Sequence, residues 1–154
     1  MGLANVWTAF PFLLLAAGVS ALEQDDLRPG MKPDEVASVY TSLRSCSNAL
    51  FIEGPDFMAW DAALFDRDAR VEVRFGQSRA SMIVIRIYLG QGDDGREVLS
   101  GLAEDNSRAA GPPEVDAAGV LVWRAPSISI KLSAGDTQDG REIRLEMTSL
   151  SSSE

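Results

Sequence analysis

The stretch from Leu64 to Phe75 constrains the fold of this chain most, because its second half alternates between apolar and charged side chains. The alternation sets Val71, Val73 and Phe75 against Arg70, Glu72 and Arg74. A period of two residues is typical of a half-buried antiparallel strand. We therefore expect a sheet that turns one face to a core and the other to water.

A similar pattern recurs from Leu121 to Leu132, and such recurrence predicts an internal repeat. The alignment pairs Leu64 with Leu121, Arg67 with Arg124, Val71 with Ile128, Val73 with Ile130, Arg74 with Lys131 and Phe75 with Leu132. We predict two tandem units, residues 33–89 and 96–150, within one domain that spans residues 33–150.

Each unit is expected to contain one helix followed by about three strands. Pro33 suits the first position of a helix, and Asp34 and Glu35 complement the positive end of its dipole. The predicted helices cover residues 33–44 and 96–106, and the predicted strands cover 50–52, 58–65, 69–75, 82–89, 119–124, 127–133 and 141–148. Residues 109–118 are expected to form a loop.

The predicted fold class is α+β. Two tandem helix-plus-antiparallel-strand units would form one two-layer sandwich, preceded by an N-terminal hydrophobic segment. Two short helices cannot cover both faces of such a sheet, so one sheet face is expected to remain open.

The first 22 residues carry no charged side chain, and Val19-Ser20-Ala21 fits a small-residue cleavage site. Residues 1–21 are therefore expected to be a secretory signal peptide or, alternatively, an uncleaved membrane anchor. Residues 22–32 form a polar lead-in, and residues 151–154 a disordered tail. The expected location is the periplasm or the exterior, with inner-membrane anchoring as the alternative and membrane contact only through residues 1–22.

The chemical inventory argues against several classes of function. The net charge is −9, which disfavours binding to nucleic acid, and the absence of His removes imidazole-based catalysis and imidazole metal ligands. Cys46 is the single cysteine. We interpret it as a buried small apolar side chain rather than as a reactive thiol. We expect no metal, no cofactor and no enzymatic activity.

Two motifs that could carry chemistry receive a structural interpretation. The stretch Gly90–Gly95 reads G-x-G-x-x-G, but Asp93 and Asp94 stand where a pyrophosphate would bind, so we interpret it as a connector. Asp66 and Asp68 could form a carboxylate pair, and a small hydrolase is kept as a third class. Acidic residues at strand ends are usually solvated.

The open sheet face is the predicted partner-binding surface, because its alternating positions include apolar and cationic side chains. The candidate contact residues are Trp60, Arg74, Met82, Arg86, Tyr88, Trp123, Lys131 and Arg144. Aromatic side chains are common interface anchors, and arginine binds carboxylates with two parallel hydrogen bonds.

The segment Gly30–Val36 resembles the Gly-Met-[Thr/Ser]-x-x-[Glu/Gln]-Val opening of the SmpA/OmlA (BamE-like) family of small envelope proteins. The resemblance implies helices packed on an antiparallel sheet, a fold that β-lactamase inhibitory protein shows in tandem. It also implies a binding role: an exported envelope module that assembles, stabilises or inhibits another protein. The alternative is a membrane-anchored accessory subunit of a larger membrane complex.

Overall fold

A computed structural model of the chain describes residues 27–44, 51–54, 56–138 and 140–150. The helices are α2 (Pro33–Arg44) and α3 (Arg96–Ala110). The strands are β1 (Phe51–Gly54), β2 (Phe57–Leu64), β3 (Arg67–Gly76), β4 (Arg79–Leu89), β5 (Glu114–Val115), β6 (Leu121–Ala125), β7 (Ile128–Thr137) and β8 (Gly140–Ser149). The expected signal or anchor segment, Cys46 and the expected tail lie outside the described residues.

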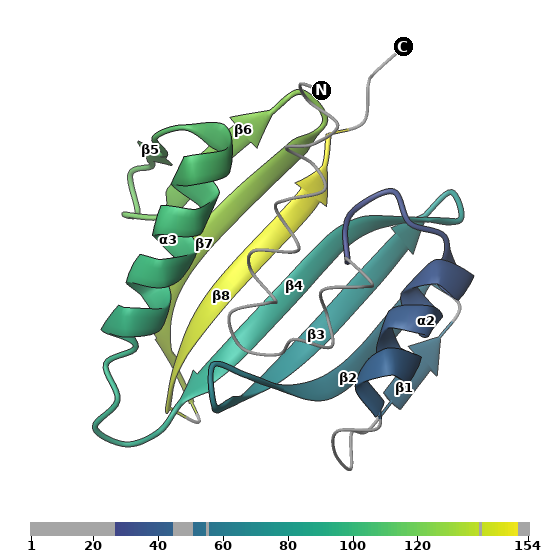
Figure 1. The fold of residues 1–154 in the computed structure, drawn as a ribbon, viewed down its shortest axis with the longest axis horizontal. Helices are drawn as coiled ribbons and strands as arrows, with labels where there is room; N and C mark the ends of the chain where they lie inside the picture. Colours follow the sequence, from purple (N-terminus) through teal and green to yellow (C-terminus); the bar gives the residue numbers. More distant parts are fainter. Residues whose placement is uncertain (1–26, 45–50, 55, 139, 151–154) are drawn as a thin grey trace.

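All eight strands join one antiparallel sheet in the order β1-β2-β3-β4-β8-β7-β6-β5. The order reflects two consecutive meanders, each introduced by a helix, which meet where β4 pairs with β8 (Figure 1). Ile85 of β4 lies opposite Leu145 of β8 near the middle of this junction. The sheet is therefore continuous through the boundary between the two halves.

The continuous sheet corrects the predicted fold class. A sandwich of two balanced helix-plus-strand units was expected, but strands dominate the described residues and the two helices are separate elements at the two sides of the sheet (Figure 1). The helices do not form a second layer as extensive as the sheet. The reason is length: long strands of ten or eleven residues in β3, β4, β7 and β8 extend the sheet well beyond the helices.

Each half of the described chain contains one helix followed by four strands, but the predicted alignment of residues between the halves fails. Val71 lies in the middle of β3, opposite Trp60 and Ile85, whereas Ile128 begins β7 opposite Ala125. The last pair of the β2–β3 hairpin is Leu64 with Arg67, and the last pair of the β6–β7 hairpin is Ala125 with Ile128. Superposing these hairpins would therefore align Ile128 with Arg67, the first residue of β3. The expected equivalence of Val71 and Ile128 is therefore wrong.

Local chemistry explains where α2 begins. The carboxylate of Glu35 accepts a hydrogen bond from the backbone N–H of Lys32 at 2.8 Å, which is half of a capping box. Just before the helix, the backbone N–H of Gly30 bonds to the carbonyl of Ala80 at 2.8 Å, and the carbonyl of Met31 accepts from the N–H of Ala80. These bonds attach the lead-in to the start of β4.

The core lies between the helices and one face of the sheet. Val36 of α2 and Val98 and Leu102 of α3 are buried in it. The sheet contributes the alternate positions of its long strands: Met58, Trp60, Val71, Val73, Ile83, Ile85, Ile87, Ile130, Leu132, Ile143, Leu145 and Met147. The predicted alternation of β3 is thus confirmed, and Val73 is fully buried.

A β-bulge near the start of β4 moves the strand boundary and changes its alternation. Residue pairing passes from Arg74–Met82 directly to Phe75–Ala80, so Ser81 is the extra residue. Its hydroxyl donates a hydrogen bond to the carbonyl of Arg74 at 3.2 Å. As a result β4 starts at Arg79, before the expected Met82, yet the side chains from Met82 onward keep the expected faces.

Candidate protein-binding face

The sheet face opposite the core carries most of the charged side chains of the strands, and no described helix covers it. Strand pairing orders these side chains in four rows that run across the strands. The first row contains Phe57, Arg74, Met82, Thr148, Ser129 and Arg124. The second contains Ala59, Glu72, Val84, Glu146, Lys131, Val122 and Glu114. The third contains Asp61, Arg70, Arg86, Arg144 and Ser133, and the fourth Ala63, Asp68, Tyr88, Glu142 and Gly135. We call this surface the striped face.

The four rows alternate in the sign of their charge. The first row holds two arginines and no anion, whereas the fourth holds two carboxylates and no cation. The second row has three carboxylates against one lysine, and the third has three arginines against one aspartate. Each row therefore carries an excess of two charges, and the signs alternate from row to row.

The striped face as a whole is electrically neutral, although the chain carries a net charge of −9. Six cations balance six anions across the four rows: Arg70, Arg74, Arg86, Arg124, Lys131 and Arg144 against Asp61, Asp68, Glu72, Glu114, Glu142 and Glu146. The excess of negative charge must lie on other surfaces. A neutral area on an acidic protein is the place where another acidic macromolecule meets the least long-range repulsion.

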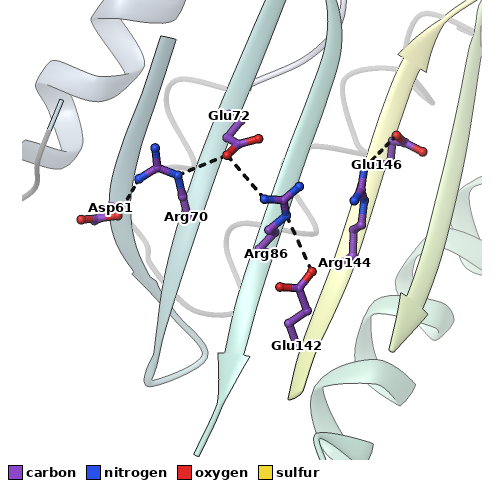
Figure 2. Close-up of polar contacts among 7 residues, drawn as sticks. All are labelled: Asp61, Arg70, Glu72, Arg86, Glu142, Arg144 and Glu146. Atoms are coloured by element: carbon purple, nitrogen blue, oxygen red, sulfur yellow. Dashed lines mark hydrogen bonds and ion pairs between the residues drawn. The ribbon is translucent and has the colours of Figure 1, made fainter. Parts of the chain in front are cut away.

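Ion pairs run within the third row and between neighbouring rows (Figure 2). Arg70 contacts Asp61 at 3.3 Å and Glu72 at 3.2 Å. Arg86 contacts Glu72 at 3.5 Å and Glu142 at 3.7 Å. Glu72 therefore joins two guanidinium groups, and a continuous chain of contacts runs over β2, β3, β4 and β8.

The three arginines of the third row are direct cross-strand neighbours, an arrangement that is unfavourable for like charges. Carboxylates of the adjacent rows compensate for it, and Arg144 is paired with Glu146 at 3.3 Å in the same way. The side chains are largely shielded from water: 14% of Glu72, 15% of Glu142 and 27% of Arg86 are exposed. The network is thus a pre-ordered surface with little rotamer freedom left to lose.

Six of the eight predicted contact residues lie on the striped face: Arg74, Met82, Arg86, Tyr88, Lys131 and Arg144. Tyr88 is 38% exposed, and burial together with the nearby Glu142 raises the pKa of its hydroxyl. The guanidinium of Arg74 lies over the ring of Phe57, 5.6 Å from its centre. Aromatic, thioether and arginine groups therefore occur together on one surface.

The two predicted tryptophan anchors lie on the other side of the sheet. Trp60 is fully buried, and Trp123 is buried where its indole N–H contacts the Ser107 hydroxyl of α3 at 3.3 Å. Neither can meet a partner in this structure, so both are removed from the candidate surface. Their positions alternate with Asp61 and Arg124, which occupy the striped face instead.

Four charged residues of the striped face were missed by the sequence reading: Asp61, Asp68, Glu114 and Arg124. The alternation of β3 could have placed Asp68, because it is two residues from Arg70. Placing Asp61 on this face depends on knowing that residues 57–64 form a strand. Placing Glu114 depends on β5, which lies inside the segment that was expected to be a loop. With these four residues the striped face carries equal numbers of cations and anions, whereas the charged residues among the predicted contacts are all cationic.

The glycine-rich stretch before α3 is an ordered connector. Gly95 has φ of 68°, and a Cβ atom there would approach Cδ1 of Leu89 to 2.7 Å, so glycine is required. Asp93 accepts a hydrogen bond from the N–H of Gly95 at 3.0 Å, and Asp94 accepts one from the N–H of Arg96. The first N–H groups of the helix are thus bonded to carboxylates of this chain.

A shallow depression of about 510 Å³ adjoins this connector, lined by residues 89–94 together with Gly140 and Arg141. It carries Asp93 and Asp94 and contains no nucleophile with a neighbouring base. Among the described residues, no group of three or more acidic or cysteine side chains could hold a metal ion. No helix in the described part of the chain is long and apolar enough to cross a membrane.

We expect Asp93→Asn to reduce stability in a pH-dependent manner. Arg67 donates to the Asp93 carboxylate at 2.6 Å, and this bond, with the Gly95 N–H, lowers the pKa of Asp93 below its usual 3.8. A lowered folded-state pKa adds stability above about pH 5, which is lost as the pH falls through that pKa. Urea unfolding should thus separate wild type from variant at pH 7, and the difference should narrow as the pH falls below 3.8 toward the lowered pKa of Asp93.

The neighbouring substitution Asp94→Asn provides the control for this effect. Among the described residues, the Asp94 carboxylate contacts Arg96 alone: it accepts from the backbone N–H at 3.0 Å, a bond that the Asn side-chain oxygen can keep, and it lies 3.8 Å from the exposed guanidinium, so its charge contributes little. Equal pH dependence of the two variants would contradict the assigned role of the Arg67–Asp93 pair.

Comparison of the chain with protein-family models, curated proteins and solved structures finds no match.

Proposed function

We propose that this protein is a non-enzymatic binding module that recognises another protein through the striped face. The observation that carries the proposal is the neutral, ordered set of alternating charge rows on a strongly acidic chain. A solvated sheet surface needs no particular order beyond local pairing of opposite charges. Rows of alternating sign instead provide a pattern that a partner surface can match and a wrong partner cannot.

The energetics of the face favour association. Glu72, Glu142 and Arg86 are already largely shielded in the free domain, so covering them removes little further hydration. Tyr88 and Met82 supply apolar area between the charged rows, and Val84 is already buried there. The combination of a tyrosine, a thioether and arginines is enriched at protein interfaces.

The proposed setting is the cell envelope or the exterior. The uncharged first 22 residues followed by acidic residues support export, and the Gly30–Val36 resemblance to SmpA/OmlA proteins supports a binding role. The proposed partner is accordingly an envelope complex or an exported enzyme.

Site-specific photocrosslinking tests this proposal. A photoreactive phenylalanine analogue at Tyr88 would replace an exposed ring on the striped face, and the same analogue at the exposed Ser100 of α3 is the matched control. In an extract of the native cell, we expect the Tyr88 position to form a covalent adduct with a distinct protein. Equal labelling from both positions would overturn the assignment of the binding surface.

Arg74→Glu is the sharpest single substitution for the same question. Arg74 is exposed, and its guanidinium lies over the Phe57 ring and belongs to no ion pair among the described residues, so its reversal should leave the fold intact. We expect about a tenfold loss of affinity for the captured partner, mainly through slower association. Arg86 is a poorer probe, because its guanidinium contacts Glu72 and Glu142 within the chain. Unchanged association kinetics would exclude the first row from the interface.

A further inference from the structure

We infer that the striped face also docks onto the striped face of a second copy of this chain, with the strand directions reversed. This inference rests on the proposed role of that face as a protein-binding surface. The order of the charge rows supports it.

Reversal of the strand direction makes the pattern complementary to itself. When two copies face each other about a two-fold axis that runs across the strands, the first row meets the fourth and the second meets the third. The cationic first row of one copy then faces the acidic fourth row of its partner, and the acidic second row faces the cationic third. Without reversal every row would face a row of its own sign. Charge order therefore selects one orientation.

The same axis places each strand over its own counterpart, which defines residue pairs. On β3, Arg74 faces Asp68 of the partner subunit, and Glu72 faces Arg70 of the partner subunit. On β8, Glu146 faces Arg144 of the partner subunit. On β4, Met82 faces Tyr88 of the partner subunit, which is an apolar contact. Each contact occurs twice, as two-fold symmetry requires.

The size of the surface indicates a weak, reversible dimer. Four rows about 6.8 Å apart over six strands about 4.8 Å apart cover roughly 500 Å² of flat sheet per copy. Stable specific interfaces bury about 800 Å² per partner. A dissociation constant of roughly 1 to 100 µM is therefore expected, weak enough for a different protein to displace the second copy.

A charge swap on one strand tests the arrangement. Asp68 and Arg74 are both exposed, and neither belongs to an ion pair among the described residues, so reversing them preserves the network of Figure 2. In a homodimer, Asp68→Arg or Arg74→Asp alone creates two repulsive contacts. The double variant restores attraction, because Arg at 68 again faces Asp at 74.

Sedimentation equilibrium of the full chain provides the measurement. We expect each single reversal to raise the dimer dissociation constant by about tenfold or more, and the double variant to return within about threefold of wild type. An equimolar mixture of the two single variants should form mixed dimers. Glu97→Arg, an equal change of charge on α3, should behave as wild type.

Two results would overturn the inference. One is a wild-type chain that stays monomeric at about 100 µM, a concentration at or above the upper limit expected for its dissociation constant. The other is a dimer that ignores both single reversals or is not restored by the double variant. The crosslinking experiment separates this failure from that of the proposed function. If the chain is monomeric but still captures a distinct protein through Tyr88, the proposed function stands and the dimer is excluded. If the chain forms a dimer that responds to the charge reversals but captures no other protein, the dimer stands and the proposed function is excluded.

Discussion

Replacing Val73 with aspartate is expected to leave the chain unfolded at room temperature. The Val73 side chain is fully buried, and it lies on β3 between Met58 and Ile83 of the neighbouring strands. A carboxylate there would lose its hydration with no cation to pair with, at a cost of several kcal/mol. Domains of this size have a total stability of about 5–15 kcal/mol, so the substitution removes most of it.

Far-UV circular dichroism and urea titration would measure the effect, with the next residue along the strand as control. Arg74→Asp introduces the same side chain on the opposite face of the strand, and this variant should keep the folded spectrum. Ile130→Asp and Lys131→Asp form a second matched pair on β7, one buried and one exposed. A folded Val73→Asp chain would mean that this face of β3 is accessible to water.

The faces of the strands were predictable because they depend only on local alternation. Val71 and Val73 of β3 and the alternate apolar residues of β4 after its bulge are buried on the core face, as the period of two requires: Ile83, Ile85, Ile87 and Leu89. Strand boundaries were harder, because two hairpins turn without glycine or asparagine. Phe65 and Asp66 of the first, and Gln77 and Ser78 of the second, all have positive φ. The usual sequence signal for such a two-residue turn is Asn-Gly, Asp-Gly or Gly-Gly, and neither hairpin contains one.

The repeat register and the tryptophans show what alternation alone misses. Aligning Val71 with Ile128 matched two apolar positions but ignored the hairpins, which fix register in a meander. For Trp60 and Trp123, large side chains suggested interface anchors, whereas strand parity placed both on the core face. Burial is the ordinary outcome for so large an apolar group when a core position is available.

The alternating charge rows could not be predicted, because they arise from pairing between strands that are distant in sequence. Arg86 becomes the neighbour of Arg144 only when β4 pairs with β8. The placement of Asp61 beside Arg70 likewise depends on the β2–β3 register. The composition of the face was therefore partly visible in the sequence, and its order was not.

That order makes Glu72 the most consequential charged residue of the striped face. Its carboxylate contacts Arg70 at 3.2 Å and Arg86 at 3.5 Å, and these arginines are direct cross-strand neighbours. Glu72→Arg would place three guanidinium groups together on two strands. The other members of its row beside it, Ala59 and Val84, offer no anion. We expect a loss of about 3 kcal/mol in the free energy of unfolding, and about 1–2 kcal/mol for Glu72→Gln.

Urea titrations at low and high salt distinguish repulsion from lost packing. Salt at 1 M screens charges beyond about 3 Å. The loss of unfolding free energy caused by Glu72→Arg should therefore shrink at high salt, while the loss caused by Glu72→Gln should change less. Glu146→Gln is the matched control in the same row, because Glu146 contacts a single arginine, Arg144, and should cost less. If Glu72→Gln and Glu146→Gln cost the same, the bridging contact contributes nothing. The third row would then be tolerated through hydration of its arginines, and the rows would lose their role as a pre-ordered surface.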